Sequence, residues 1–215
     1  MFELIKLSAP FIVAIVITAI VTPAWISVCK KYHLFDKPDN RKHHVTSTPS
    51  MGGLAIVAGI FISFFIFSGG SDYYKLKFIF GASLLLFFTG IFDDLLNMRP
   101  QKKIVMQLIA GIIVVAGGTR LTNLYGLMGI NEIPMWFQCP ITLLIIILFT
   151  NAFNFIDGID GLAGSIGLIS TIIFGYLFFK YGQIDFALLC FCLTGSLIGF
   201  LFYNFHPAKV FMGDT

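Results

Sequence analysis

Long apolar runs separated by short polar segments make up most of the chain. This pattern predicts an all-α polytopic membrane helix bundle. We place about seven spans, near residues 4–28, 51–67, 78–92, 104–118, 140–155, 162–179 and 186–202. The fourth run is short for a span, which needs roughly 17 to 25 residues, so we expect it to continue past Arg120.

Small residues recur at every fourth position in the second, sixth and seventh runs, as at Gly195 and Gly199. On a helix this spacing forms one face along which two backbones approach closely. Such faces predict tight helix packing. We therefore expect residues 1–215 to form a single membrane-embedded domain.

The composition agrees with a membrane protein, since 57% of the residues are hydrophobic and 12% are charged. A soluble domain carries about 25% charged residues. The mean hydropathy is +0.90. The formal net charge of +3 is small, so no nucleic-acid partner is needed to explain it.

The most unusual stretch is 151–164, NAFNFIDGIDGLAG, at the end of a hydrocarbon run. It places Asn151, Asn154, Asp157 and Asp160 at steps of three. Residues three apart share a helix face, which predicts a polar stripe at the end of an apolar helix. Ionisable groups at a membrane segment are costly and suggest function. Two plainer interpretations stay open, namely interhelical hydrogen bonding by the amides and turn formation by the Asp-Gly pairs.

Seven alternating crossings put most charges on one side of the membrane. That side holds nine of the 14 basic residues, Lys30, Lys31, Lys37, Arg41, Lys42, Arg99, Lys102, Lys103 and Lys209, so it is predicted to be cytoplasmic. It also holds all four histidines and a series of acids: Asp36, Asp39, Asp93, Asp94, Asp157, Asp160 and Asp214. Solubility alone does not explain acids so close to the membrane. We predict a site at the lipid–water boundary.

Clustered carboxylates repel one another unless a cation joins them, and Mg²⁺ prefers oxygen ligands together with substrate phosphates. Basic side chains on the same side are suited to hold phosphate oxygens; they are Arg41, Lys42, His44, Lys102, Lys103 and Lys209. These parts favour phosphoryl transfer between a lipid and a soluble substrate. Other interpretations are a basic cluster that only sets topology, a non-catalytic scaffold, and a cation transporter, whose site usually lies near the membrane midplane.

Four stretches carry a family resemblance: DKPDNRKHH with PSMGG, GIFDDLLNMRPQKK, NAFNFIDGIDGLAG and KVFMGDT. Together they resemble the polyprenyl-phosphate N-acetylhexosamine-1-phosphate transferases, of the glycosyltransferase family 4 type. The resemblance implies transfer of a phospho-sugar from a UDP-sugar to undecaprenyl phosphate, with release of UMP and a requirement for Mg²⁺, or Mn²⁺ in its place. It also implies a multi-pass protein of the bacterial cytoplasmic membrane with cytoplasmic active-site loops.

Two branches of this family are relevant. DKPDNRKHH and NAFNFIDGIDG are more similar to the branch that uses GlcNAc-1-phosphate to start lipopolysaccharide O-antigen, enterobacterial common antigen or teichoic acid linkage units. The phospho-MurNAc-pentapeptide translocases of peptidoglycan synthesis remain the alternative. Whether the protein is a monomer or a homodimer also stays open.

Position by position, the resemblance implies roles for the acids. Asp93 and Asp94 match a DD motif linked to acceptor activation and to the metal. Asp214 matches an acid taken as a Mg²⁺ ligand. These three are the implied catalytic and metal-binding residues.

The resemblance implies a second group of residues around the nucleotide-sugar. Asp157 and Asp160, with Asn154, border the nucleotide, and Phe211 stacks on the uracil. The first cytoplasmic loop adds Arg41, Lys42 and His44. Without a family role, Phe211 is an ordinary phenylalanine, one of 25 in the chain.

The chain stops at Thr215, inside the GDTGS motif of the family. Family members continue with further spans and a His-rich cytoplasmic loop. On this basis we expect the sequence to be truncated, and the 215-residue chain by itself to be inactive or impaired.

Overall fold

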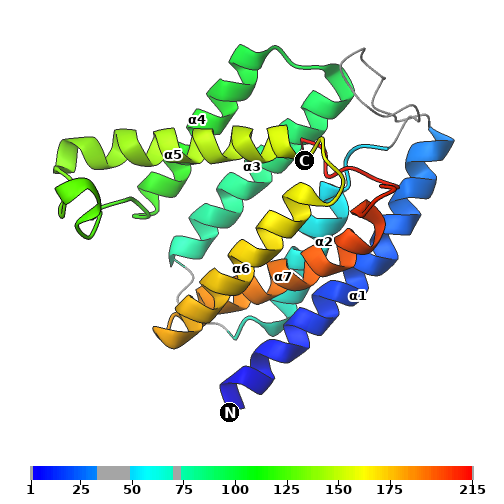
Figure 1. The fold of residues 1–215 in the computed structure, drawn as a ribbon, viewed down its shortest axis with the longest axis horizontal. Coiled ribbons are helices and arrows are strands. Elements are labelled where there is room, and N and C mark those ends of the chain that lie inside the picture. The colour runs from blue at the N-terminus through cyan, green and yellow to red at the C-terminus, as the bar shows by residue number, and fades with distance from the viewer. Residues whose placement is uncertain (1, 33–48, 70–73, 215) are drawn as a thin grey trace. The chain divides into compact units, whose positions relative to one another are not determined.

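The computed structural model describes residues 2–32, 49–69 and 74–214, and within these ranges it contains α-helices and no β-strand (Figure 1). The helices are α1 (Phe2–Lys31), α2 (Gly53–Phe67), α3 (Tyr74–Leu96), α4 (Pro100–Ala116), α5 (Met135–Ile156), α6 (Leu162–Lys180) and α7 (Ile184–Asn204), with a short 3₁₀ turn η1 (Leu127–Gly129). Each predicted apolar run is one of these α-helices. The all-α prediction is therefore confirmed.

Several helices are long and apolar enough to cross a membrane. In the described part of the chain there are five, Leu7–Lys31, Tyr74–Leu96, Met135–Ile156, Leu162–Lys180 and Ile184–Asn204, and Gly53–Phe67 is a shorter apolar helix. Large apolar side chains such as Ile20, Leu148 and Ile169 are exposed on their surfaces. Outward-facing apolar side chains of this kind are suited to contact lipid. The protein is a membrane-integral helix bundle.

The predicted extension of the fourth run past Arg120 is wrong. Helix α4 instead begins earlier, with Pro100 in its first turn, and ends at Ala116. Proline is favoured at a helix start because the first N–H groups of a helix have no partner within it, so proline, which has no N–H, loses no hydrogen bond there. After the helix, Gly118 has a φ of +83°, and the chain forms an isolated antiparallel bridge between Asn123 and Glu132.

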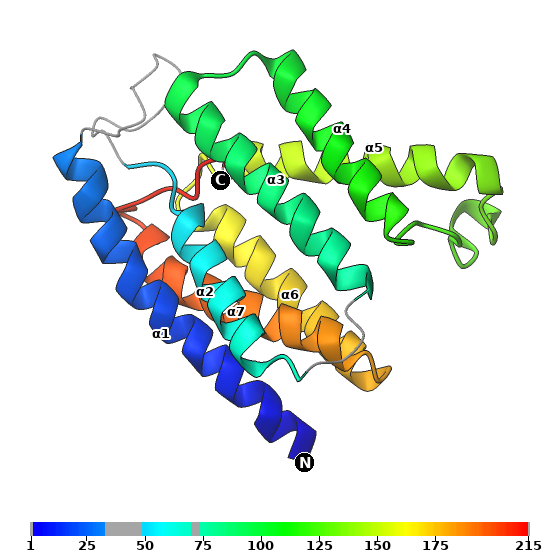
Figure 2. The same cartoon turned by 180° about the vertical axis from the view of Figure 1, so that it is seen from behind.

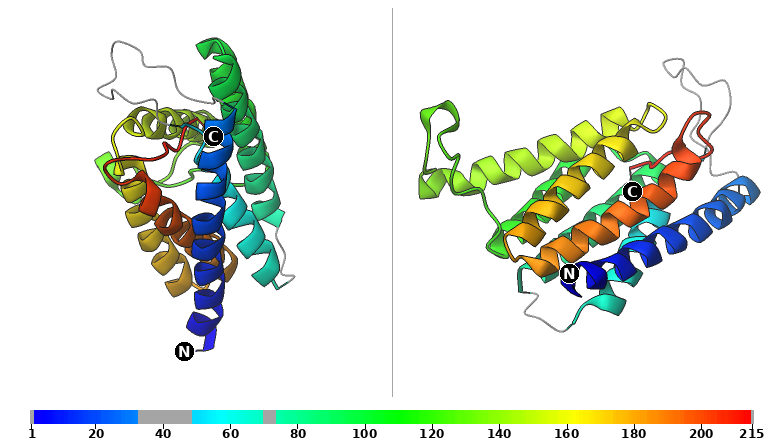
Figure 3. Two further views of the ribbon diagram at one scale, coloured as in Figure 1. Left: turned by 90° about the vertical axis from the view of Figure 1, so that its right-hand side faces the viewer. Right: turned by 60° about the horizontal axis from the view of Figure 1, so that its bottom comes forward.

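The chain divides into two compact units, which are described separately. Unit 1 comprises Met1–Ser71 with Asn154–Thr215, and unit 2 comprises Asp72–Phe153. The single-domain prediction is not tested by this division and stays a prediction. In unit 1, α7 lies against α1, α2 and α6 (Figures 2 and 3).

Small residues explain how closely α7 approaches its neighbours. A Cβ added at Gly199 would lie 2.8 Å from the carbonyl oxygen of Ile15 in α1, and one at Gly195 would overlap the carbonyl oxygen of Phe11. The prediction that this face of α7 is a packing face is confirmed. Near the end of α7, Leu197 and Phe200 join a buried apolar cluster with Ile26, Ile56 and Val210.

Unit 2 contains α3, α4 and the greater part of α5. A Cβ at Gly117 would lie 2.6 Å from the Cβ of Phe78 in α3, and one at Gly111 would lie 2.7 Å from Leu143 Cδ2 in α5. Glycines therefore set close approach on two sides of the α4 segment. The Asp93–Asp94 pair lies near the C-terminal end of α3, shortly before the connection to α4.

Candidate functional site

Three helix ends and the C-terminal segment meet at one end of unit 1. The segment 205–214 follows α7 and carries Phe211 and Asp214. Its backbone pairs with the residues before α2: Gly52 N–H donates to Phe211 O and Gly53 N–H to Met212 O, both at 2.9 Å. On the other side, the segment contacts the turn between α5 and α6. In Figure 1 this segment is the red trace that follows α7.

The predicted polar stripe on one helix face is wrong. Helix α5 ends at Ile156, so Asn151 and Asn154 lie on it, whereas Asp157 and Asp160 lie in the turn before α6. Gly161 at the end of this turn has a φ of +70°, a conformation that glycine adopts readily. The Asp-Gly pairs form a turn, as one interpretation of the sequence predicted.

In this turn, both carboxylates bind the 205–214 segment. Asp157 Oδ2 accepts a hydrogen bond from Gly213 N–H at 2.9 Å, and its Oδ1 accepts one from Met212 N–H at 3.3 Å. Asp160 Oδ2 accepts from Ala208 N–H at 3.1 Å and lies 2.8 Å from Nδ1 of His206. Asp157 is only 8% exposed. The two acids therefore connect the α5–α6 turn to the 205–214 segment.

Asn204, the last residue of α7, is a site residue that the sequence reasoning missed. Its Oδ1 accepts a hydrogen bond from Gly161 N–H at 3.1 Å, and its Nδ2 donates to Val210 O at 2.8 Å. The side chain is 1% exposed. The available signal was a single amide at the end of an apolar run.

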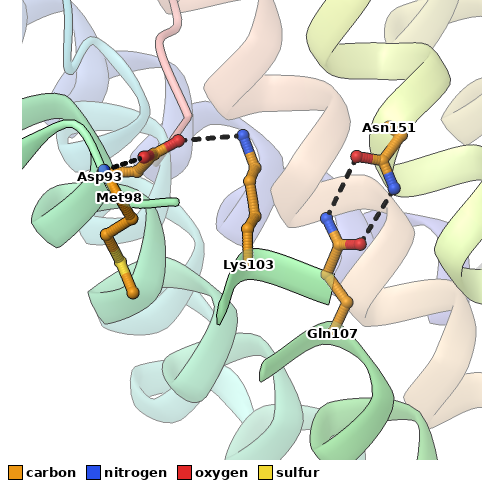
Figure 4. Close-up of polar contacts among 5 residues, drawn as sticks. All are labelled: Asp93, Met98, Lys103, Gln107 and Asn151. Carbon is orange, nitrogen blue, oxygen red and sulfur yellow. Dashed lines mark hydrogen bonds and ion pairs between the residues drawn. The ribbon is translucent and has the colours of Figure 1, made fainter. Parts of the chain in front are cut away.

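In unit 2, Asp93 organises the connection between α3 and α4. Its Oδ1 accepts a hydrogen bond from Met98 N–H at 2.7 Å, and its Oδ2 forms an ion pair with Lys103 Nζ at 3.1 Å (Figure 4). Asp94 follows on the last turns of α3. Lys103, predicted as a phosphate ligand, contacts Asp93 here.

Beside this connection lies a hollow of about 290 Å³. Its lining combines two cations with apolar and amide side chains: Phe92, Leu96, Asn97, Met98, Arg99 and Lys102. Such a lining is chemically suited to an amphiphilic anion, because the guanidinium and ammonium attract phosphate while the apolar groups contact a hydrocarbon tail.

Helices α4 and α5 are joined by a reciprocal amide pair. Asn151 Nδ2 donates to Gln107 Oε1 at 2.8 Å, and Gln107 Nε2 donates to Asn151 Oδ1 at 3.4 Å (Figure 4). Gln107 is fully buried. The interpretation of an amide from the 151–164 stretch as interhelical hydrogen bonding is therefore correct for Asn151.

The predicted site residues are distributed as follows. Unit 1 contains Asn154, Asp157, Asp160, Phe211 and Asp214, and unit 2 contains Asp93 and Asp94. The predicted nucleotide ligands Arg41, Lys42 and His44 lie outside the described residues. Within the described ranges, no three His, Cys, Asp or Glu side chains are grouped to hold a metal ion. The roles in catalysis, nucleotide binding and metal binding stay predictions.

Comparison with known proteins gives related sequences along the whole chain. A protein of Bacillus subtilis (strain 168) named "Probable undecaprenyl-phosphate N-acetylglucosaminyl 1-phosphate transferase" is 34% identical over 215 residues, which cover 99% of this chain and 60% of the relative. A Yersinia pestis "Undecaprenyl-phosphate alpha-N-acetylglucosaminyl 1-phosphate transferase" is 33% identical over 194 residues, covering 87% and 53%. This chain therefore spans little more than half the length of these two relatives.

A second kind of relative also matches. The "Phospho-N-acetylmuramoyl-pentapeptide-transferase" of Listeria welshimeri is 32% identical over 231 residues, covering 99% of this chain and 71% of the relative. Residues 76–215 match the family described as glycosyl transferase family 4. The matched region includes the Asp93–Asp94 pair, the Asp-Gly turn and the Asp214 segment, and the chain belongs to glycosyl transferase family 4.

Proposed function

We propose that the protein transfers N-acetylglucosamine 1-phosphate from UDP-GlcNAc to undecaprenyl phosphate at the cytoplasmic membrane face and releases UMP. The observation that carries this proposal is the 34% identity, over 99% of the chain, to the Bacillus subtilis protein named "Probable undecaprenyl-phosphate N-acetylglucosaminyl 1-phosphate transferase". The product would start a cell-envelope polysaccharide.

Each unit has a feature that supports one of the two proposed substrates, a soluble phosphate compound and a lipid. The Asp214 segment is held against the ends of apolar helices in unit 1. The hollow in unit 2 combines Arg99 and Lys102 with apolar side chains, which suits the phosphate and first carbons of a polyprenyl chain. A membrane-integral bundle with both features fits a reaction at the lipid–water boundary.

In the proposed reaction, Asp94 or Asp93 either accepts a proton from the lipid phosphate or orients the lipid phosphate. A phosphate oxygen then attacks the β-phosphorus of the UDP-sugar in line. The bond between the β-phosphorus and the bridging oxygen breaks, and UMP leaves. A two-step route through a phospho-sugar on an aspartate is the alternative, and trapping that adduct without acceptor would decide for it.

The carboxylate oxygens of Asp93 and Asp94 in unit 2 and of Asp214 in unit 1 each fit the donor preference of Mg²⁺, and each is proposed as a metal ligand, with Mn²⁺ as a substitute. When bound, the metal neutralises developing charge on the pyrophosphate. Phe211 is assigned to the uracil. Asn154, Asp157 and Asp160 border the nucleotide, with Arg41, Lys42 and His44 from the first loop.

The test uses the gene product that contains these 215 residues, purified in detergent with undecaprenyl phosphate and radiolabelled UDP-GlcNAc. We expect label in the lipid fraction. We expect Asp93→Asn, Asp94→Asn and Asp214→Asn each to lower turnover by at least about a hundredfold. Asp185→Asn, in the first turn of α7, is the matched control and should retain activity. Normal turnover in any one of the three site variants would refute the assignment.

The second candidate is transfer of phospho-MurNAc-pentapeptide, favoured by the 32% identity to the Listeria welshimeri protein of that name. A donor swap in the same assay distinguishes the two. Label transfer from UDP-MurNAc-pentapeptide, with none from UDP-GlcNAc, would establish the second candidate in place of the first.

A further inference from the structure

We propose that Asp157 and Asp160 are positioning residues that fix the 205–214 segment and thereby set the places of Phe211 and Asp214. This role requires no direct contact with the nucleotide whose border Asp157 and Asp160 are proposed to form. It rests on the proposed function only for what Phe211 and Asp214 do. The fixing of the segment is a property of unit 1 alone.

The first observation is the use that Asp157 makes of its two oxygens. Oδ1 accepts from Met212 N–H and Oδ2 from Gly213 N–H, the two residues that immediately precede Asp214. Hydrogen bonds to a charged acceptor are roughly twice as strong as neutral ones. A nearly buried carboxylate therefore clamps the backbone directly before Asp214.

The second observation is that other contacts hold the same segment along its length. Asp160 binds Ala208 N–H and His206, and Asn204 links Gly161 to Val210. On the opposite side, Phe211 N–H donates to Pro49 O at 2.9 Å, and Gly52 N–H returns a bond to Phe211 O. The segment is held from two sides before it reaches Asp214.

The two acids differ in a way that makes the proposal testable. Asp157 uses a separate oxygen for each backbone N–H, so an asparagine there keeps one acceptor and turns an NH₂ group toward the other N–H. For Asp160, Ala208 N–H and His206 Nδ1 both bind the same oxygen, Oδ2. An asparagine at 160 keeps that oxygen with its two lone pairs. The same substitution should therefore have unequal effects.

The experiment measures amide hydrogen exchange of the peptide 205–214 in the gene product, in detergent and without substrate. We expect Asp157→Asn to speed exchange at Met212 and Gly213 by about tenfold or more, because a hydrogen bond to a charged group is lost. Asp160→Asn should change exchange of the segment by less than about threefold. Asp185→Asn is the matched control, with exchange as in the parent protein.

A second variant guards against loss of folding. Asp157→Glu keeps both oxygens and the charge but adds one methylene, and its exchange should fall between the parent and Asp157→Asn. Parent-like exchange in both Asp157 variants would overturn the proposal. If Asp157→Asn and Asp160→Asn speed amide exchange of the segment equally, the proposed difference between the two acids is also overturned.

Kinetics give an independent measure, because Asn204 is not assigned to any substrate. If Asp157 acts through the segment, Asp157→Asn and Asn204→Ala should change kcat and the KM for UDP-GlcNAc in the same pattern. Both variants should also need more Mg²⁺ for activity, because both release the segment that carries Asp214. If Asp157 contacts the nucleotide directly, KM changes in Asp157→Asn while Asn204→Ala stays close to the parent, and the proposal fails. A gene product without transferase activity would refute the proposed function and leave the exchange result standing.

Discussion

At the scale of single residues, carboxylates and amides in this protein are anchors as well as candidate reactive groups. Asp157, Asp160 and Asn204 hold one segment by bonds to its backbone, and Asp93 holds the α3–α4 connection. The sequence predicted that these acids matter because they lie near apolar runs. It did not predict what they bind, since those partners lie up to 56 positions away.

The amide pair of Gln107 and Asn151 gives a prediction at this scale. Gln107→Leu removes both hydrogen bonds between the two amides, although Asn151 Nδ2 keeps its bond to Ile147 O, so we expect the free energy of unfolding to fall by about 1–2 kcal/mol. The double variant Gln107→Leu/Asn151→Leu should lose less than the sum of the single variants, because no buried amide is left unmatched. Thermal unfolding in detergent measures this.

The control for the amide pair is Gln101→Leu, at an exposed position in the first turn of α4, where we expect a change within about 0.5 kcal/mol. If the stability losses of the two single variants add up to that of the double variant, Gln107 and Asn151 are not energetically coupled, and the prediction is contradicted.

At the scale of helices, hydropathy correctly predicted which segments are helical. The residues at which the helices begin and end depend on features that hydropathy does not report. The Asp-Gly turn ended α5 at Ile156, four residues before the predicted stripe ended at Asp160. For α4, the start at Pro100 came from proline geometry. The packing faces were correctly predicted from glycine spacing because close approach excludes larger side chains.

The packing face of α7 gives a prediction at the element scale. Gly195→Ala and Gly199→Ala place a methyl group against the α1 backbone, so each should lower the free energy of unfolding by about 1–3 kcal/mol. Gly81→Ala, where an added Cβ meets open space, is the matched control and should be neutral or slightly stabilising. Melting temperatures in detergent compare the three variants, and a parent-like value for both α7 variants would be inconsistent with the packing.

At the scale of the whole molecule, the basic residues and the acids predict one cytoplasmic side. In unit 1 the structure brings together the starts of α2 and α6 and the end of α7, all of which the crossing count assigns to that side. The convergence is what an alternating series of spans requires. The membrane side itself is a prediction from the positive-inside rule.

Cysteine labelling tests this topology. Lys180 and Lys209 are exposed and flank α7, whose 21 residues rise about 30 Å, close to one bilayer core. In a gene product whose native cysteines are replaced, including the four of these 215 residues, we expect a membrane-impermeant maleimide to label Lys180→Cys in intact cells. Lys209→Cys should be labelled only in inverted vesicles. Labelling of both from one side would disprove the crossing of α7.

The sequence by itself determined that the protein is an all-helical membrane bundle, which helices it contains, and which motifs place it near the phospho-sugar transferases. Local hydropathy and short motifs are enough to predict these properties. Lipid offers no hydrogen-bond partners, so each span must form its backbone hydrogen bonds within its own helix. Only the tertiary structure decided that Asp157, Asp160 and Asn204 fasten the Asp214 segment, and that Gln107 pairs with Asn151. Such contacts join residues about 40 to 56 positions apart, and no local pattern specifies them.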